Sequence, residues 1–158
     1  MQQHVLIVGA GPVGLVSALV LGQAGVRVTV LEQSAQLNMD LRASTFHPPT
    51  LDMLATLGLT PSLVAQGLVA RYTQQRDRRE GVIAEFDMQL LAEDTAHPFR
   101  LQCEQWKLTQ LIAEQLRAFP DVRILLQASV ESVTQDTKGV TVKANHAGES
   151  LTLEADYL

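Results

Sequence analysis

The spacing of apolar residues changes along the chain, and each spacing predicts a different kind of element. The run Val5–Val8 is apolar throughout and leads directly into glycines, which is typical of a buried strand that turns into a helix. The helix is predicted over Pro12–Gln23 and ends before Gly25, because proline is tolerated in a first turn. The β-branched run Val26–Glu32 then completes a strand–helix–strand unit with a parallel crossover.

The next part of the chain carries the start and stop signals of two short helices. Pro49–Leu57 is predicted as a helix that is stopped by Gly58. Thr60 is predicted as the N-cap of a second helix, with Pro61 at its first position and Gly67 at its end.

A hairpin, a longer helix and another strand are predicted after these helices. Arg71–Arg76 and Val82–Met88 are expected to pair as a hairpin, with Gly81 in the turn. Glu104–Phe119 has apolar residues at helical spacing and is predicted as an amphipathic helix. Val122–Leu126 is apolar on both faces, which predicts a further strand of the parallel sheet.

From Ala128 onward the apolar period falls to two. The segments "SVESVTQ", "VTVKA" and "LTLEA" alternate apolar and polar residues and are separated by turn residues, which predicts a three-stranded antiparallel meander. The fold class is therefore α/β: a Rossmann-like fold, with a parallel sheet and a crossover helix, followed by the meander. The length of 158 residues allows one domain with a hydrophobic core.

Composition narrows the possible partners and the compartment. The net charge of −5 argues against nucleic acid and against an anionic membrane surface, because both need a basic face. The apolar stretch Val13–Leu21 is shorter than the ~20 residues that cross a bilayer. Cys103 is the single cysteine, so no internal disulfide forms, and the opening residues lack the features of a signal peptide. These features favour a cytoplasmic protein.

The glycines after the first strand carry the main chemical signal. Gly9, Gly11 and Gly14 form a G-x-G-x-x-G fingerprint in which the first permits the turn, the second lets backbone N–H groups approach a pyrophosphate, and the third allows close helix packing. Pro12 lies in the first turn of the helix that provides the positive end of its dipole. Glu32 ends the second strand, where an acidic side chain accepts from ribose hydroxyls. The pattern indicates a dinucleotide but no particular reaction, because NAD enzymes, FAD enzymes and non-catalytic nucleotide binders share it.

Other reactive side chains form no recognisable constellation. The four histidines are scattered without metal-ligand spacing, so no metal site is expected. Cys103 has no base partner in the sequence and is expected to be a packing residue. No catalytic residue can be named.

Two longer segments point to a particular family. The stretch "LRASTFHPPTLDMLATLGL", Leu41–Leu59, resembles the Arg-Ala-centred segment of the flavoprotein aromatic hydroxylases, which are FAD-dependent monooxygenases of the p-hydroxybenzoate hydroxylase and phenol hydroxylase type. The stretch "LQCEQWKLTQLIAEQL" is similar to the glutamine-led helix of that family. The resemblance covers essentially the whole chain.

The resemblance implies FAD as the cofactor and assigns roles to single residues. The glycines would face the FAD pyrophosphate, and Glu32 would bind the adenosine ribose. Arg42 would lie near the pyrophosphate and the sugar-alcohol chain of the flavin, since a planar charged donor suits phosphate oxygens. Gln105 would hydrogen-bond to FAD, although Gln102 leaves this assignment open by one turn. Gln33 stands where the family often has an arginine, which puts a contact of that arginine in doubt.

The resemblance also implies a reaction. NAD(P)H would reduce the FAD, the reduced flavin would capture O2 as a C4a-hydroperoxide, and oxygen would pass to a small phenol-like aromatic substrate. Other FAD-fold oxidoreductases, such as a halogenase or a reductase, and a non-catalytic dinucleotide-binding module stay open as alternatives. Residues 1–158 are expected to be the N-terminal part of a truncated FAD-binding domain, without the rest of that domain and the substrate domain. Such a fragment is expected to be inactive and to self-associate.

Overall fold

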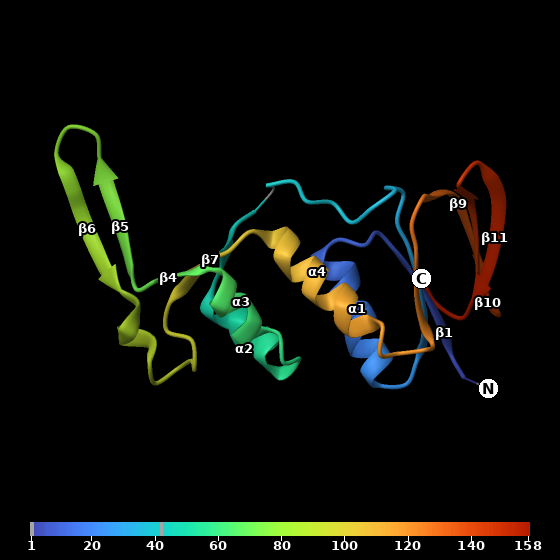
Figure 1. Cartoon of the computed structure of the whole chain (residues 1–158), viewed down its shortest axis with the longest axis horizontal. Coiled ribbons are helices and arrows are strands. Elements are labelled where there is room, and N and C mark those ends of the chain that lie inside the picture. Colours follow the sequence, from blue (N-terminus) through green and yellow to red (C-terminus); the bar gives the residue numbers. More distant parts are fainter. Residues whose placement is uncertain (1, 42) are drawn as a thin grey trace. The chain divides into compact units, whose positions relative to one another are not determined.

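The computed structural model describes residues 2–41 and 43–158, so Arg42 lies outside the described residues. The chain divides into two compact units, Met1–Asp40 with Leu108–Leu158 and Leu41–Lys107, and Figure 1 colours them in the order of the sequence. Each unit is described separately below. Over the described residues, no helix combines the length and the apolar character that crossing a bilayer would require.

The first unit contains a parallel sheet built from two amino-terminal strands and one later strand. Its strands are β1 (His4–Val8), β2 (Arg27–Leu31) and β8 (Val122–Leu125), and β2 lies in the middle. The helix α1 (Pro12–Gln23) connects β1 to β2. Four of the five residues of β2 are buried, as expected for a strand that is covered on both faces. The predicted strand–helix–strand unit and the addition of the later strand to its sheet are confirmed.

The same unit contains the predicted meander. β9 (Ala128–Asp136), β10 (Gly139–His146) and β11 (Glu149–Ala155) form an antiparallel sheet with β10 in the middle, and Figure 1 shows the three strands side by side. A hydrophobic core contains buried residues from both sheets: Leu6, Leu31, Ala128 and Val142. The alternating pattern of the meander strands therefore directs one face of this sheet toward the parallel sheet.

After β11 the chain returns to the first strand. Tyr157 forms a parallel bridge with Val5, and the N–H of Leu6 donates to the carbonyl of Tyr157 at 2.9 Å. The backbone groups on this side of β1 are therefore partly satisfied by the residues that follow the meander.

The second unit contains a small sheet that the sequence patterns do not predict. Its strands are β3 (Thr45–Phe46), β7 (Arg100–Gln102) and β4 (Leu68–Ala70), which pair antiparallel with β7 in the middle. Strands of two or three residues are too short to show a period of two, so their pairing depends on contacts between distant segments. The predicted helices are present as α2 (Pro48–Thr56) and α3 (Thr60–Gln66).

Between Tyr72 and Leu116 the chain also contains a hairpin and a longer helix. β5 (Tyr72–Asp77) and β6 (Gly81–Asp87) form the predicted hairpin, and Gly81 has a φ of +82°, the left-handed region that favours glycine in a turn. A short 3-10 helix, Met88–Leu91, follows β6. The predicted amphipathic helix is α4 (Gln105–Leu116), whose buried residues lie at helical spacing.

The predicted capping role of Thr60 is wrong. Leu59 is the N-cap of α3, and Thr60 is the first helical residue. Thr60 is only 1% exposed, and its hydroxyl donates to the carbonyl of Leu51 in α2 at 2.6 Å. A buried hydroxyl needs a partner, and the carbonyl of Leu51 within the preceding helix supplies it more readily than the first turn of its own helix.

Candidate dinucleotide site

The loop between β1 and α1 is held at both of its ends. Gly9 has a φ of +99°, a conformation that favours glycine, and its N–H donates to the carbonyl of Leu31 at the end of β2 over 2.7 Å. Gly11 is the N-cap of α1, and its carbonyl accepts from the N–H of Leu15 at 2.9 Å. The sequence thus builds a tight turn whose backbone is already fixed by the neighbouring strand and helix.

The second and third glycines have different surroundings. A Cβ atom at Gly14 would lie 2.1 Å from the carbonyl oxygen of Gly9, so any side chain there would force α1 away from the loop. A Cβ atom at Gly11 would meet no atom within 4 Å, so it would project into open space. Because Pro12 has no N–H, the donors available in the first turn come from the residues after it. This open cradle at a helix N-terminus fits an anionic pyrophosphate.

Glu32 is hydrogen-bonded to the backbone of this loop. One oxygen of its carboxylate accepts from the N–H of Ala10 at 2.8 Å, and the other accepts from the N–H of Ser34 at 2.9 Å. These donors hold the half-buried carboxylate in one orientation at the end of β2. An ionised carboxylate has about four lone-pair positions, so the same oxygens can also accept from ribose hydroxyls.

A pocket of about 220 Å3 lies beside Glu32. Its walls come from the end of β1 with Gly9, from the end of β2 with Glu32 and Gln33, and from the first residues of β9. Ligands of open parallel α/β sheets bind at this carboxyl end of the strands. The sequence patterns did not identify the wall formed by β9, because a period of two predicts a strand but not the edge that it meets.

In the second unit, the two candidate glutamines lie in different surroundings. Gln105 begins α4, and its N–H donates to the carbonyl of Ala43 at 2.9 Å. The Gln102 side-chain oxygen accepts from the hydroxyl of Thr45 at 3.0 Å, and its side-chain nitrogen donates to the hydroxyl of Ser44 at 2.6 Å. A pocket of about 440 Å3 is lined by Gln102 and Ser44, whereas Gln105 is not among the described residues that line it.

Charged and sulfur-containing side chains line another part of the same pocket. The ammonium of Lys107 lies 2.6 Å from the carboxylate of Glu104 and donates to the carbonyl of Gln66 at 3.1 Å. This pairing raises the pKa of Lys107 and lowers the pKa of Glu104. Burial raises the pKa of the Cys103 thiol, so the thiol stays neutral and is no activated nucleophile.

The glycine loop, the helix that it opens and the fixed acidic residue define the chain as a dinucleotide-binding protein of the Rossmann-like class. Comparison with known proteins gives the family. Residues 2–158 match the FAD binding domain family, and the chain belongs to this family.

Two curated relatives from Pseudomonas illustrate the similarity. The para-nitrophenol 4-monooxygenase of Pseudomonas sp. (strain WBC-3) is 34% identical over 154 residues, which cover 98% of this chain and 38% of the relative. The 6-hydroxy-3-succinoylpyridine 3-monooxygenase of Pseudomonas putida (strain DSM 28022 / S16) is 34% identical over 158 residues, which cover 100% of this chain and 40% of the relative. The chain thus spans about two fifths of the length of these relatives.

Solved structures agree with this assignment. The crystal structure of p-nitrophenol 4-monooxygenase from Pseudomonas putida DLL-E4 matches with a TM-score of 0.93 and 34% identity, over 99% of this chain and 39% of that chain. A ternary complex of aklavinone-11 hydroxylase with FAD and aklavinone matches with a TM-score of 0.79 and 27% identity, over 99% of this chain and 32% of that chain. The resemblance to FAD-dependent aromatic monooxygenases is confirmed, and the family and the solved complex both support FAD as the cofactor.

Proposed function

We propose that this chain is the FAD-binding part of a monooxygenase that hydroxylates a small, phenol-like aromatic substrate. The observation that supports this proposal most directly is the carboxylate of Glu32, which the N–H of Ala10 holds beside the pocket of about 220 Å3. An acid in this position suits the two ribose hydroxyls of an adenosine and disfavours a 2′-phosphate. The names of the relatives, which include nitrophenol and hydroxypyridine monooxygenases, support an aromatic substrate.

The cofactor contacts that we propose follow the fingerprint. The pyrophosphate would contact the glycine loop and the start of α1: Gly9, Gly11, Pro12 and Gly14. Glu32 would bind the ribose. Arg42, which lies outside the described residues, keeps the role near the pyrophosphate and the sugar-alcohol chain that the resemblance implies. In the second unit we assign the contact to Gln102, because its amide lines a pocket, and retain Gln105 as the alternative.

In this proposal the cofactor supplies the redox chemistry, and the residues of this chain bind and orient the cofactor. FAD would supply the transfer of electrons from NAD(P)H to O2 and the insertion of an oxygen atom into the ring. The residues named above would bind and orient the cofactor, and we assign none of them as an acid or base for the substrate. Residues 1–158 would form the N-terminal part of the FAD-binding domain of a longer enzyme. The chain has a single cysteine and therefore no internal disulfide, which is typical of a protein in a reducing compartment such as the cytoplasm.

Thermal unfolding of the whole protein with separate additions of FAD, NAD and NADP tests the cofactor. A ligand that binds the folded state raises the unfolding temperature by mass action, so we expect the largest rise with FAD. A rise with NAD or NADP and none with FAD would instead favour a nicotinamide-dependent enzyme or a non-catalytic dinucleotide-binding module.

Turnover by the whole protein tests the reaction. With p-nitrophenol as the first probe, we expect oxidation of NADH or NADPH, consumption of O2 and an oxygenated product, with release of nitrite where the oxygen enters at the carbon that bears the nitro group. A halogenated product that requires a halide salt would identify a halogenase. Oxidation of NAD(P)H without any oxygenated product, over a panel of phenols, would favour a reductase.

A further inference from the structure

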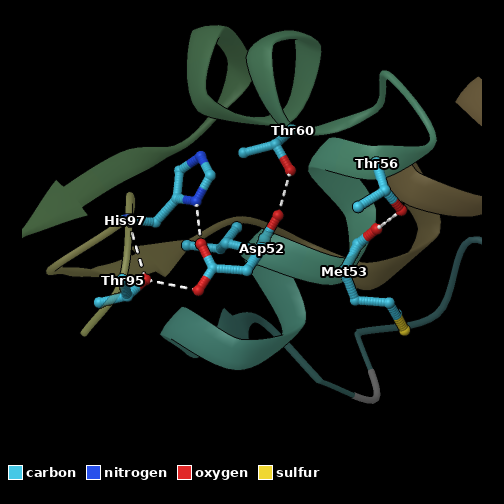
Figure 2. A network of polar contacts seen from close by, with 7 residues as sticks. Asp52, Met53, Thr56, Thr60, Thr95 and His97 are labelled. Carbon is cyan, nitrogen blue, oxygen red and sulfur yellow. Dashed lines mark hydrogen bonds and ion pairs between the residues drawn. The ribbon is translucent and has the colours of Figure 1, made fainter.

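A polar network in the second unit joins α2 to the segment before β7, as Figure 2 shows. One oxygen of the Asp52 carboxylate lies 2.6 Å from Nδ1 of His97, and the other accepts from the hydroxyl of Thr95 at 2.6 Å. The N–H of His97 also donates to the hydroxyl of Thr95 at 3.0 Å. Hydrogen bonds from Thr95 and His97 lower the pKa of Asp52, so its carboxylate is ionised at neutral pH. None of these residues belongs to the site proposed above.

The position of this network in the fold relates it to the pairing of β3 with β7. One residue separates β3 from α2, and two residues separate His97 from β7. β3 and β7 are antiparallel, so the network lies toward the end of the pair where β7 begins. Gln102 lies at the other end of β7, opposite Thr45, and its amide contacts the hydroxyls of Thr45 and Ser44. Gln102 and Ser44 also line the pocket of about 440 Å3.

The hydrophobic pattern of β7 does not by itself define its register. Leu101 is completely buried, so a slip by one residue would exchange it for a polar neighbour and is excluded. A slip by two residues would bring Phe99 or Cys103 to the same core position and would keep the face of the strand unchanged. It would also place Arg100 or Glu104, instead of the glutamine, opposite the threonine of β3.

We propose that Asp52 is a positioning residue that sets the register of β7 against β3 and thereby places Gln102 at the pocket. Asp52 holds Thr95 and His97 to α2, and His97 precedes Gln102 by only a few residues. A slip by two residues would move the strand by about 6.6 Å, which no hydrogen bond of the network could span. The contacts of Asp52 support its role in the register of β7 without any cofactor, whereas the link from this register to FAD binding rests on the proposed function.

Hydrogen exchange tests the register without any cofactor. The N–H groups of Cys103 and Gln105 donate to the carbonyls of Ser44 and Ala43, and so they report directly on this pairing. In Asp52→Leu we expect both amides to exchange about tenfold faster or more, as the loss of about 1.4 kcal/mol from local opening would produce. The amide of Leu63 within the same unit, which donates to Leu59, should keep its exchange rate.

Two further variants separate positioning from general stability. Asp52→Asn should restore most of the protection, because an amide can accept from His97 while it donates to the hydroxyl of Thr95. Thr56→Val, on the same helix, should leave the exchange rates of both amides unchanged. The hydroxyl of Thr56 is exposed and, as Figure 2 shows, donates to the carbonyl of Met53. Unchanged exchange in Asp52→Leu, or an equal acceleration at Leu63, would overturn the inference. If Asp52→Leu does not fold, Thr95→Val gives the same comparison.

A double-mutant cycle on FAD affinity tests the link to the pocket in the whole protein. We expect Asp52→Leu and Gln102→Leu each to weaken FAD binding by about tenfold, the upper range for one lost hydrogen bond. The double variant should bind no more weakly than Gln102→Leu alone, because Asp52 acts through Gln102. Additive losses, or no effect of Gln102→Leu alone, would overturn this link. Absence of FAD binding by the unmodified protein would instead contradict the proposed function, and the exchange experiment would still decide the register.

Discussion

The backbone N–H of Ala10 donates to the carboxylate of Glu32 over 2.8 Å, although the two residues are 22 positions apart in the sequence. Ala10 lies between the first two glycines of the fingerprint, and Glu32 follows β2. The loop proposed to bind the pyrophosphate and the acid proposed to bind the ribose are therefore positioned together. A substitution at this site can therefore remove a cofactor contact or disturb the loop. Experiments must measure both FAD binding and the stability of the folded protein to distinguish these effects.

Gly11→Val should abolish FAD binding and leave the fold intact. Gly11 has a φ of −72° and a ψ of 178°, which other residues adopt, and a Cβ atom there meets nothing within 4 Å. The side chain would instead fill the space proposed for the pyrophosphate. Absorbance of bound flavin in the purified whole protein, together with urea unfolding, measures both effects. A fully FAD-loaded Gly11→Val protein would contradict the proposed site.

Gly14→Ala is the matched comparison, and we expect it to lower the stability of the folded protein. Its added Cβ atom would lie 2.1 Å from the carbonyl oxygen of Gly9, a distance that requires α1 to move. We expect a lower urea midpoint for Gly14→Ala than for Gly11→Val. The reverse order would contradict the close approach of Gly14 to the carbonyl of Gly9.

Glu32→Ala should weaken the binding of ADP, which carries the adenosine ribose without the flavin, by about 1–3 kcal/mol. The reason is that polar groups of the ligand would lose their acceptor, and that the N–H of Ala10 would lose its partner. Isothermal titration calorimetry measures the affinity. Equal affinity of the variant and the unmodified protein would mean that Glu32 only braces the loop.

The two glutamines near the start of α4 allow a direct comparison. Gln102→Leu should weaken FAD binding more than Gln105→Leu, because only the first of these amides lines the pocket among the described residues. Fluorescence titration of FAD against each variant measures the difference. A larger loss in Gln105→Leu would restore the assignment that the family resemblance first suggested.

Stability should fall in mild acid because of His4. The ring of His4 is buried, and its Nδ1 lies 3.2 Å from the carbonyl of Glu154 and must donate to it, since a carbonyl only accepts. Nε2 therefore accepts from the hydroxyl of Thr29 at 3.0 Å. Burial first, and then the charge of Arg27, lower the pKa of His4 below its ordinary value of 6.5.

The sign of the pH effect follows from this lowered pKa. The unfolded chain binds a proton on His4 at a higher pH than the folded chain, so the contribution of His4 is complete above about pH 6.5 and declines as the pH falls below it. We expect a lower urea midpoint at about pH 5.5 than at about pH 7.5. His4→Gln, which can still donate and accept, should reduce this difference. An unchanged difference in His4→Gln would assign the acid sensitivity to other groups.

Elements whose signals are continuous in the sequence could be predicted from it. The apolar run before Gly9, the glycine spacing and the β-branched second strand each lie within one short segment, so the βαβ unit is apparent before folding is considered. The period of two after Ala128 likewise predicted the meander. These local patterns, with the family-like segment after Asp40, were sufficient to indicate an FAD-binding domain.

Only the tertiary structure decided how distant groups meet. β3 has two residues and no period of its own, so its pairing with β7 depends on long-range contacts. The hydroxyl of Thr60 donates to the carbonyl of Leu51 and does not cap its own helix, because a buried hydroxyl needs an acceptor and packing places this carbonyl beside it. The bond between Asp52 and His97 joins residues 45 positions apart, and no sequence spacing signals such a pair. A sequence pattern records which residues avoid water, whereas hydrogen bonds between distant side chains depend on the distances and directions that packing sets.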